Sequence, residues 1–211
     1  MMTNPDQAGF TADGLGNFIS ETPGEGNTEI WEIVNLTMDA HPIHTHLVQF
    51  QLLNRQTFDL EKYNTAYGAA FVKGGFQPGF GPPLDYAPSA ASGGKYGGNP
   101  DVTPFLNGAI MPPNANEAGW KDTVMAPPGT VTRFVVRFAP TDIAIGGTGG
   151  NSNTLHYSFL PNDNIPGNPG AQFDYVWHCH IVDHEDNEMM RPDIILPKSG
   201  VLRSYKIGVD Y

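Results

Sequence analysis

Glycine and proline interrupt this chain so often that long regular elements are excluded from much of it. Of the 211 residues, 25 are glycine and 19 are proline, and these two types fill 17 of the 40 positions from Gly74 to Pro113. That density rules out a long helix or a regular strand in this interval and predicts an irregular excursion that covers a surface or a partner. A second loop rich in glycine, proline and asparagine is expected from about Ala139 to Gln172. The chain is therefore expected to fold as short strands joined by long loops.

Several segments between these loops have the composition of strands. From Thr28 the run TEIWEIVNL is rich in β-branched and aromatic residues, and it ends at the turn-like pair Asp39-Ala40. The run TVTRFVVRF, residues 130–138, alternates as a half-buried strand does. Two last strands are expected at about residues 174–177 and 191–196.

The run HLVQFQLLNR, residues 46–55, is predicted to be a central strand. It places Val48, Phe50 and Leu52 on one face, while Leu47 and Leu53 lie on the other, which predicts burial on both sides at places. The chain shows no internal repeat and no helical pattern of about 10–15 residues between the strands. This combination predicts an antiparallel β-sandwich or Greek-key barrel.

The charge balance excludes one class of partner. Lys and Arg total 11 against 22 Asp and Glu, giving a net charge of −11 that repels phosphate backbones, so no nucleic-acid partner is expected. No stretch approaches the roughly 18 apolar residues of a membrane span, and the start, MMTNPDQAGF, shows no signal-peptide pattern. We expect a soluble chain and leave its compartment open.

Six of the seven histidines are concentrated in two short segments, HPIHTH and WHCHIVDHEDNEMM. The second segment also contains Cys179, the single cysteine, and two methionines. Imidazole, thiolate and thioether together suit copper best, whereas zinc would more often recruit several cysteines or a carboxylate. The two segments are therefore predicted to form metal sites.

The spacing in the second segment predicts two centres rather than one. Alternate residues of a strand point to opposite faces, so His178 and His180 should look one way and Cys179 the other. Cys179, His184 and Met189 are spaced so that a tight loop can bring them round one metal. With a histidine from the first segment they would form a trigonal His₂Cys site with a weak axial thioether, which is the blue-copper ligand set.

Three segments carry a resemblance to a known family: HPIHTHLVQFQLLNR, GWKDTVMAPPGTVTRF and YVWHCHIVDHEDNEMMRP. They resemble the third, C-terminal cupredoxin domain of multicopper oxidases, especially spore-coat laccases and bilirubin oxidases. The resemblance implies an all-β, cupredoxin-like Greek-key barrel or sandwich with long Gly/Pro-rich loops. Residues 1–211 are then a single domain with its core at about 28–60 and 119–196, and residues 61–118 are an irregular insertion.

The resemblance also implies a role for each ligand in this sequence. Type 1 copper would be bound by His41, Cys179 and His184, with Met189 as axial ligand. Type 2 copper would take His44, and the type 3 pair would take His46, His178 and His180. Glu185 matches an acidic residue that assists proton delivery during dioxygen reduction in the family.

The implied activity is that of a laccase-like multicopper oxidase. A phenol, aromatic amine or tetrapyrrole would give up single electrons at the type 1 copper, and dioxygen would be reduced to water at the trinuclear cluster. That cluster takes eight histidines in the family, and this chain supplies four of them. The resemblance therefore implies a hetero-oligomer with a polypeptide that carries two further HxH motifs on its own cupredoxin domains, either a separate subunit or the rest of a cleaved precursor.

Two alternative functions belong to other classes. A one-copper blue electron carrier would need only the type 1 ligands and would leave four histidines unexplained. A non-catalytic structural subunit would need no copper, so a copper count separates the three hypotheses. His156, alone in NTLHYSF, is interpreted as a non-ligand, and Met190 as a packing residue.

Overall fold

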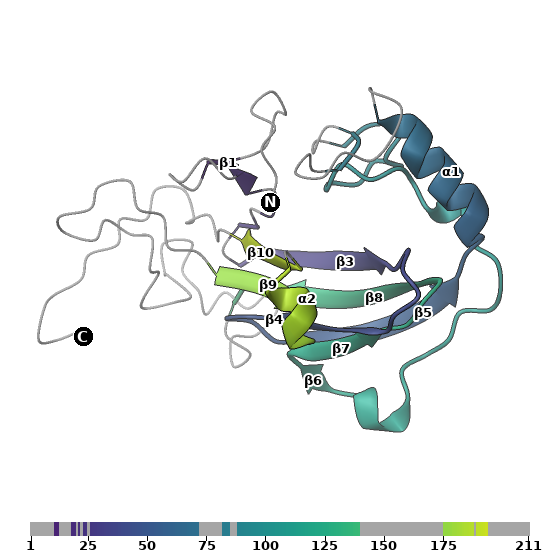
Figure 1. Ribbon diagram of the computed structural model, residues 1–211. Coiled ribbons are helices and arrows are strands. Elements are labelled where there is room, and N and C mark those ends of the chain that lie inside the picture. The colour runs from purple at the N-terminus through teal and green to yellow at the C-terminus, as the bar shows by residue number, and fades with distance from the viewer. Residues whose placement is uncertain are drawn as a thin grey trace, which may run out of the picture.

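The computed structural model describes residues 11–12, 18–19, 21, 23–24, 26–71, 82–84, 88–139, 175–187 and 189–193. These residues form two four-stranded antiparallel sheets and a separate short pair of strands, β1 (Thr11–Ala12) and β2 (Phe18–Ile19) (Figure 1). The first sheet has the order β10 (Met190–Asp193), β9 (Tyr175–Cys179), β4 (His41–Thr45), β7 (Thr123–Ala126). The second has the order β3 (Thr28–Val34), β8 (Thr130–Arg137), β5 (Phe50–Thr57), β6 (Trp120–Lys121). The predicted all-β sandwich is confirmed.

The main core lies between the two sheets. Phe50 and Phe134 of the second sheet are fully buried, with ring centroids 4.3 Å apart. Ile43 and Cys179 belong to the same cluster from the first sheet. Since Cys179 ends β9 inside this core, the packing of the two sheets fixes where its sulfur lies.

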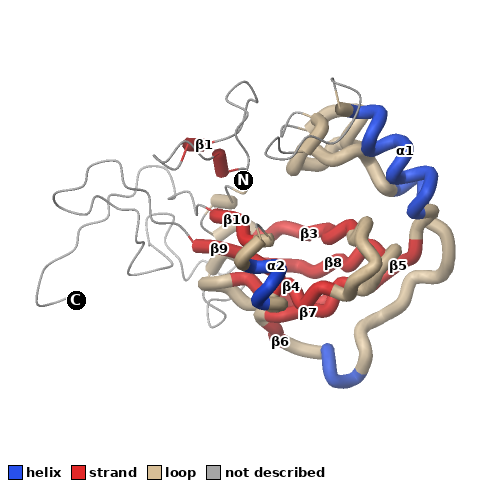
Figure 2. Tube along the Cα trace, in the orientation of Figure 1, coloured by secondary structure: helices blue, strands red, loops and turns tan. Residues whose placement is uncertain are grey.

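A second apolar cluster holds a helix, α1 (Leu60–Ala70), over the end of the second sheet (Figure 2). Tyr63 of α1 is 1% exposed, and its hydroxyl donates to the carbonyl of Pro100 at 2.8 Å. The expectation of an irregular insertion over 61–118 is therefore wrong for residues 61–70, which are helical. Periodicity did not reveal α1 because Tyr63 is its one buried side chain, while Asp59 caps it by accepting from the Lys62 amide.

The rest of the described insertion contains two short 3₁₀ turns, η1 (Thr103–Phe105) and η2 (Ala115–Glu117). Residues 82–84 and 88–113 include neither a long helix nor a regular strand, as the glycine and proline content predicts. The single-domain interpretation stays a prediction. The loop expected from 139 to 172 lies outside the described residues beyond Ala139.

The expected strands are confirmed with shifted ends. On β5, the face that was expected to be buried in places is exposed. The strand begins at Phe50, and Leu47 and Leu53 are 37% and 38% exposed rather than buried. Leu53 directly follows the buried Leu52, so the alternation of the strand turns it outward, beside a break in the β5–β8 register. Leu47 precedes the strand in a turn with φ of 66°. None of the described helices is long and apolar enough to span a membrane.

Candidate metal centres

Strand β9 feeds two groups of metal-ligating side chains from neighbouring residues. Cys179 groups with His41 and His184, and the adjacent His178 groups with His44 and His46. In each group the three ligand atoms lie within 4.8 Å of one another. The alternation of β9 therefore places Cys179 and its neighbour His178 in different centres, as the spacing predicts.

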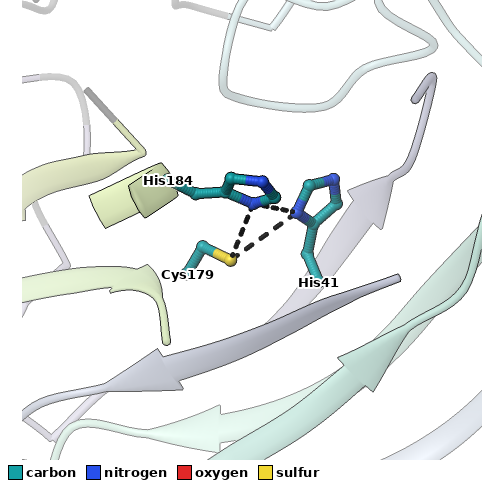
Figure 3. Close-up of side chains that lie close together, drawn as sticks. All are labelled: His41, Cys179 and His184. Carbon is teal, nitrogen blue, oxygen red and sulfur yellow. Dashed lines mark hydrogen bonds between the residues drawn. The ribbon is translucent and has the colours of Figure 1, made fainter. Parts of the chain in front are cut away.

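The first centre, defined as His41, Cys179 and His184, has the dimensions of a trigonal metal site (Figure 3). Cys179 Sγ lies 3.5 Å from His41 Nδ1 and 3.6 Å from His184 Nδ1, and the two nitrogens are 3.2 Å apart. Ligand lengths of about 2.0 Å to nitrogen and 2.3 Å to sulfur would give separations of about 3.5–3.7 Å in a planar set. The observed triangle is close to this size, and a His₂Cys donor set suits copper.

Three separate elements supply this centre. His41 is the first residue of β4, Cys179 the last of β9, and His184 lies in the short helix α2 (Val182–Glu185). Burial lowers the pKa of His41, and the neighbouring His184 lowers it further. A neutral imidazole is the form that binds a metal. His41 is therefore held ready to act as a ligand.

The backbone of Met189, in the loop after α2, is hydrogen-bonded to two residues of the first centre, and Met190 is exposed. The Met189 amide donates to the His184 carbonyl at 3.0 Å, and its own carbonyl accepts from the Cys179 amide at 2.9 Å. Its side chain is half-buried against the core cluster that contains Cys179, whereas Met190 is 41% exposed. The backbone bonds thus favour Met189 over Met190, and its role as axial ligand stays a prediction.

The second centre gathers four imidazole rings, those of His44, His46, His178 and His180. His46 Nε2 and His178 Nε2 are 3.2 Å apart, and the ring of His44 lies 5.0–5.4 Å from the other three. His180 lies beside His178 at 5.3 Å between ring centroids, although it is not among the three whose ligand atoms group most closely. Partial desolvation by the surrounding protein lowers the pKa of His46, and His44 and His178 lower it further.

The second centre is open on one side. His46 and His180 are exposed, although His178 is only 4% exposed. A cavity of about 370 Å³ adjoins it, lined in part by His44, His46 and Leu47. The imidazoles of the second centre are thus gathered at an open surface.

Glu185 lies between the two centres. It directly follows His184 in α2, and its Oε2 is 3.2 Å from Nδ1 of His178. The same Nδ1 is 3.1 Å from the Cys179 carbonyl. With its Nδ1–H shared between these two oxygens, His178 turns Nε2 toward His46.

Sequence reasoning missed the residues that surround the first centre. The Thr37 hydroxyl is 2.6 Å from His41 Nε2, and Asp39 Oδ2 is 3.9 Å from His184 Nε2. Both lie in the turn between β3 and β4, where the polar residues at every second position of Asn-Leu-Thr-Met-Asp were the signal that could have found them. His156 lies outside the described residues.

Comparison with known proteins gives a consistent result. A family model described as multicopper oxidase matches residues 12–143. The chain is 32% identical to a laccase of Bacillus subtilis over 174 residues, which is 82% of this chain and 21% of that protein. It is 34% identical to a laccase of Bacillus stratosphericus, covering 84% of this chain and 22% of that protein. It is 31% identical to multicopper oxidase LPR1 of Arabidopsis thaliana, with 82% and 23% covered. The chain thus spans about a fifth of the length of these curated relatives.

Proposed function

The chain belongs to the multicopper oxidase family, as its C-terminal cupredoxin domain, and we propose that it forms part of a laccase-like oxidase whose trinuclear copper cluster is shared with another polypeptide. The observation that carries this proposal is the pairing of a closed centre with an open one on adjacent residues of β9. The closed centre, at His41, Cys179 and His184, has a full trigonal ligand set. The open centre has four imidazoles and a free side.

The residues fit the copper ions of such an oxidase in the following way. His41, Cys179 and His184 would hold the type 1 ion with Met189 as axial ligand, His44 the type 2 ion, and His46, His178 and His180 the type 3 pair. When bound, copper supplies the one-electron redox chemistry and the reduction of dioxygen.

Substrate oxidation would take place at the rim of the first centre. The side chain of His184 is 28% exposed, whereas His41 and Cys179 are buried. A phenol, aromatic amine or tetrapyrrole could therefore approach the edge of the His184 ring without any movement of the core. The Asp39 carboxylate beside this ring could accept a hydrogen bond from the hydroxyl or amino group of such a donor.

The two centres are connected through consecutive residues of the chain. Cys179 of the first centre is bonded through the backbone to His178 and His180 of the second. The His178 Nδ1 contact with the Cys179 carbonyl holds the first of these rings against the same peptide. Rigid geometry here would keep the two centres at a constant separation.

Glu185 would move protons at the second centre. Its side chain is 27% exposed, so it can exchange a proton with solvent, and its other contact is the ring of His178. A carboxyl group with one side in water and one at the cluster is suited to proton delivery.

A shared cluster requires a surface that covers the open centre. In this family the cluster takes twice the histidines that this chain supplies, and the sequence holds two HxH motifs, His44-Thr45-His46 and His178-Cys179-His180. The missing motifs would come from cupredoxin domains on a separate subunit or on the rest of a longer chain. A one-copper electron carrier is the second candidate, because the first centre alone is closed.

Oxygen consumption tests the proposal. The purified chain is loaded with copper and given a phenolic donor, alone and with a polypeptide that carries the other HxH motifs. We expect dioxygen uptake only in the second case. Four-electron oxidase activity of the chain by itself would refute the shared cluster, and a chain that binds one copper and exchanges electrons without oxygen uptake under either condition would be a carrier.

A further inference from the structure

The turn between β3 and β4 contains a closed hydrogen-bond network that ends on His41. Asn35, 3% exposed, donates from its amide to the carbonyls of Asp39 at 2.7 Å and Ala126 at 2.9 Å. Because both partners are acceptors, the NH₂ group of Asn35 must face them and its Oδ1 must point the other way. The orientation of this side chain is therefore fixed.

The orientation of Asn35 fixes the direction of the next hydrogen bond. Its Oδ1 accepts from the Thr37 amide at 2.9 Å and lies 2.8 Å from the Thr37 hydroxyl. The Asp39 carbonyl, at 3.3 Å, is a second oxygen within reach of this hydroxyl. Oδ1 of Asn35 and this carbonyl can only accept, so the hydroxyl of Thr37 donates to them.

Since its own proton is used, Thr37 Oγ1 can only accept from His41. The distance to His41 Nε2 is 2.6 Å, so that nitrogen carries the ring proton. Nδ1 of the same ring is then unprotonated and points at Cys179 Sγ and His184 Nδ1. Ala126 is the residue that pairs with His41 between β4 and β7. Its carbonyl accepts from Asn35, so the network is attached to the strand beside His41.

We propose that Asn35 and Thr37 are positioning residues that fix the tautomer and ring orientation of His41, so that its Nδ1 is presented to the metal of the first centre. The inference rests on the proposed copper-binding function of that centre. Hydrogen bonds of this kind to a ligating histidine typically change metal affinity by about 10- to 100-fold.

Asn35 and Thr37 also belong to a sequence pattern with another interpretation, which the structure does not support. Asn35-Leu36-Thr37 matches the acceptor pattern for N-glycosylation. The Asn35 amide, however, is buried and makes hydrogen bonds with both of its donors. The polar pair is therefore explained by its bond to His41.

The experiment compares Thr37→Val, which removes the hydroxyl at nearly constant volume, with Thr37→Ser, which keeps it. Thr65→Val is the matched control, because Thr65 is an exposed threonine on α1 whose hydroxyl bonds to the Glu61 carbonyl. Nitrogen-15 spectra of the metal-free protein report which ring nitrogen of His41 holds the proton. Competition titration reports the affinity for Cu(II).

In the wild-type chain and in Thr65→Val we expect a solvent-protected proton on His41 Nε2. Thr37→Val should lose that protection and bind Cu(II) about 10- to 100-fold more weakly, and Thr37→Ser should restore both. A wild-type ring proton on Nδ1, or a Thr37→Val chain with unchanged ring signals and affinity, would overturn the inference. A wild-type chain that binds no copper would contradict the proposed function alone, because the spectra of the metal-free ring still decide the role of Thr37.

Discussion

His41 and His178 each use one ring nitrogen for a bond to the protein and turn the other toward a metal centre. His41 bonds through Nε2 to Thr37, and His178 through Nδ1 to the Cys179 carbonyl and Glu185. The two rings therefore present opposite nitrogens. The sequence predicts both residues as ligands but not the nitrogen each would use, because that depends on partners that folding brings together.

The axial position of the first centre can be tested with neighbouring methionines. Since the axial ligand tunes the reduction potential, Met189→Leu should keep the blue colour and raise the potential of the copper-loaded chain. Met190→Leu is the matched control, because Met190 is exposed and should leave the potential unchanged. Redox titration of both variants measures this, and a larger effect from Met190 would shift the ligand assignment by one residue.

The turn between β4 and β5, which contains His46, has a strained backbone at Leu47. Leu47 has φ of 66°, and the Val48 amide donates across it to the His46 carbonyl at 2.7 Å, which closes a γ-turn. A bulky residue at positive φ is unfavourable by about 1–2 kcal/mol. This turn directs the Val48 side chain into the core while His46 remains at the second centre.

This strain predicts an unusual order of stabilities. Leu47→Gly should change the free energy of unfolding by less than about 1 kcal/mol, because relief of strain offsets the entropy cost of glycine. Leu47→Val should destabilise by about 1–2 kcal/mol or more, since a β-branched side chain tolerates positive φ poorly. Urea unfolding of the two variants tests this, and a large loss of stability in Leu47→Gly would show that the leucine side chain supports the fold.

A partly buried ion pair joins η2 to β5. Arg55 Nη1 donates to Glu117 Oε2 at 2.9 Å, and this hydrogen bond lowers the pKa of Glu117 to about 2. Because the folded pKa lies below the unfolded value of about 4.3, the pair stabilises the fold above that value, and its contribution is lost as pH falls through about 2.

At pH 7, Glu117→Gln should therefore lower the free energy of unfolding by about 1–2 kcal/mol, because solvent partly screens the pair, and the difference from wild type should shrink toward zero as pH falls to about 2. Glu61→Gln is the control, since Glu61 is exposed on α1. Denaturant unfolding between pH 2 and 7 measures both. A difference that is independent of pH would show that the Glu117 charge is not what stabilises the fold.

The strands could be predicted because their pattern lies in neighbouring residues. The helix α1 could not be predicted in this way. Alternation of Thr132, Phe134 and Val136 against Arg133 and Val135 reads directly as a strand with one buried face, and β8 has it. In α1 the local pattern is weak, and its place depends on the distant partners Pro100 and Phe105. The break in register between Leu52 and Asn54 likewise depends on the pairing with β8.

Across the whole molecule, the two sheets bring together segments that are far apart in the chain. The ligands His41 and Cys179 lie 138 residues apart and meet because β4 and β9 are neighbours in one sheet. The sequence predicted the ligand types and their division between two centres from spacing. It did not predict the network of Asn35 and Thr37, since that network needs the Ala126 carbonyl of β7.

The central claim is that one closed copper centre and one open one share strand β9, and stepwise copper titration of the purified chain tests it most directly. Visible absorption follows the sulfur-to-copper charge transfer of the Cys179 thiolate, with Cys179→Ser as control. We predict an intense blue band that saturates at a single equivalent of copper, further copper that binds more weakly without adding blue colour, and a colourless Cys179→Ser variant. A fully loaded chain without a blue band, or a Cys179→Ser variant that keeps it, would contradict the account.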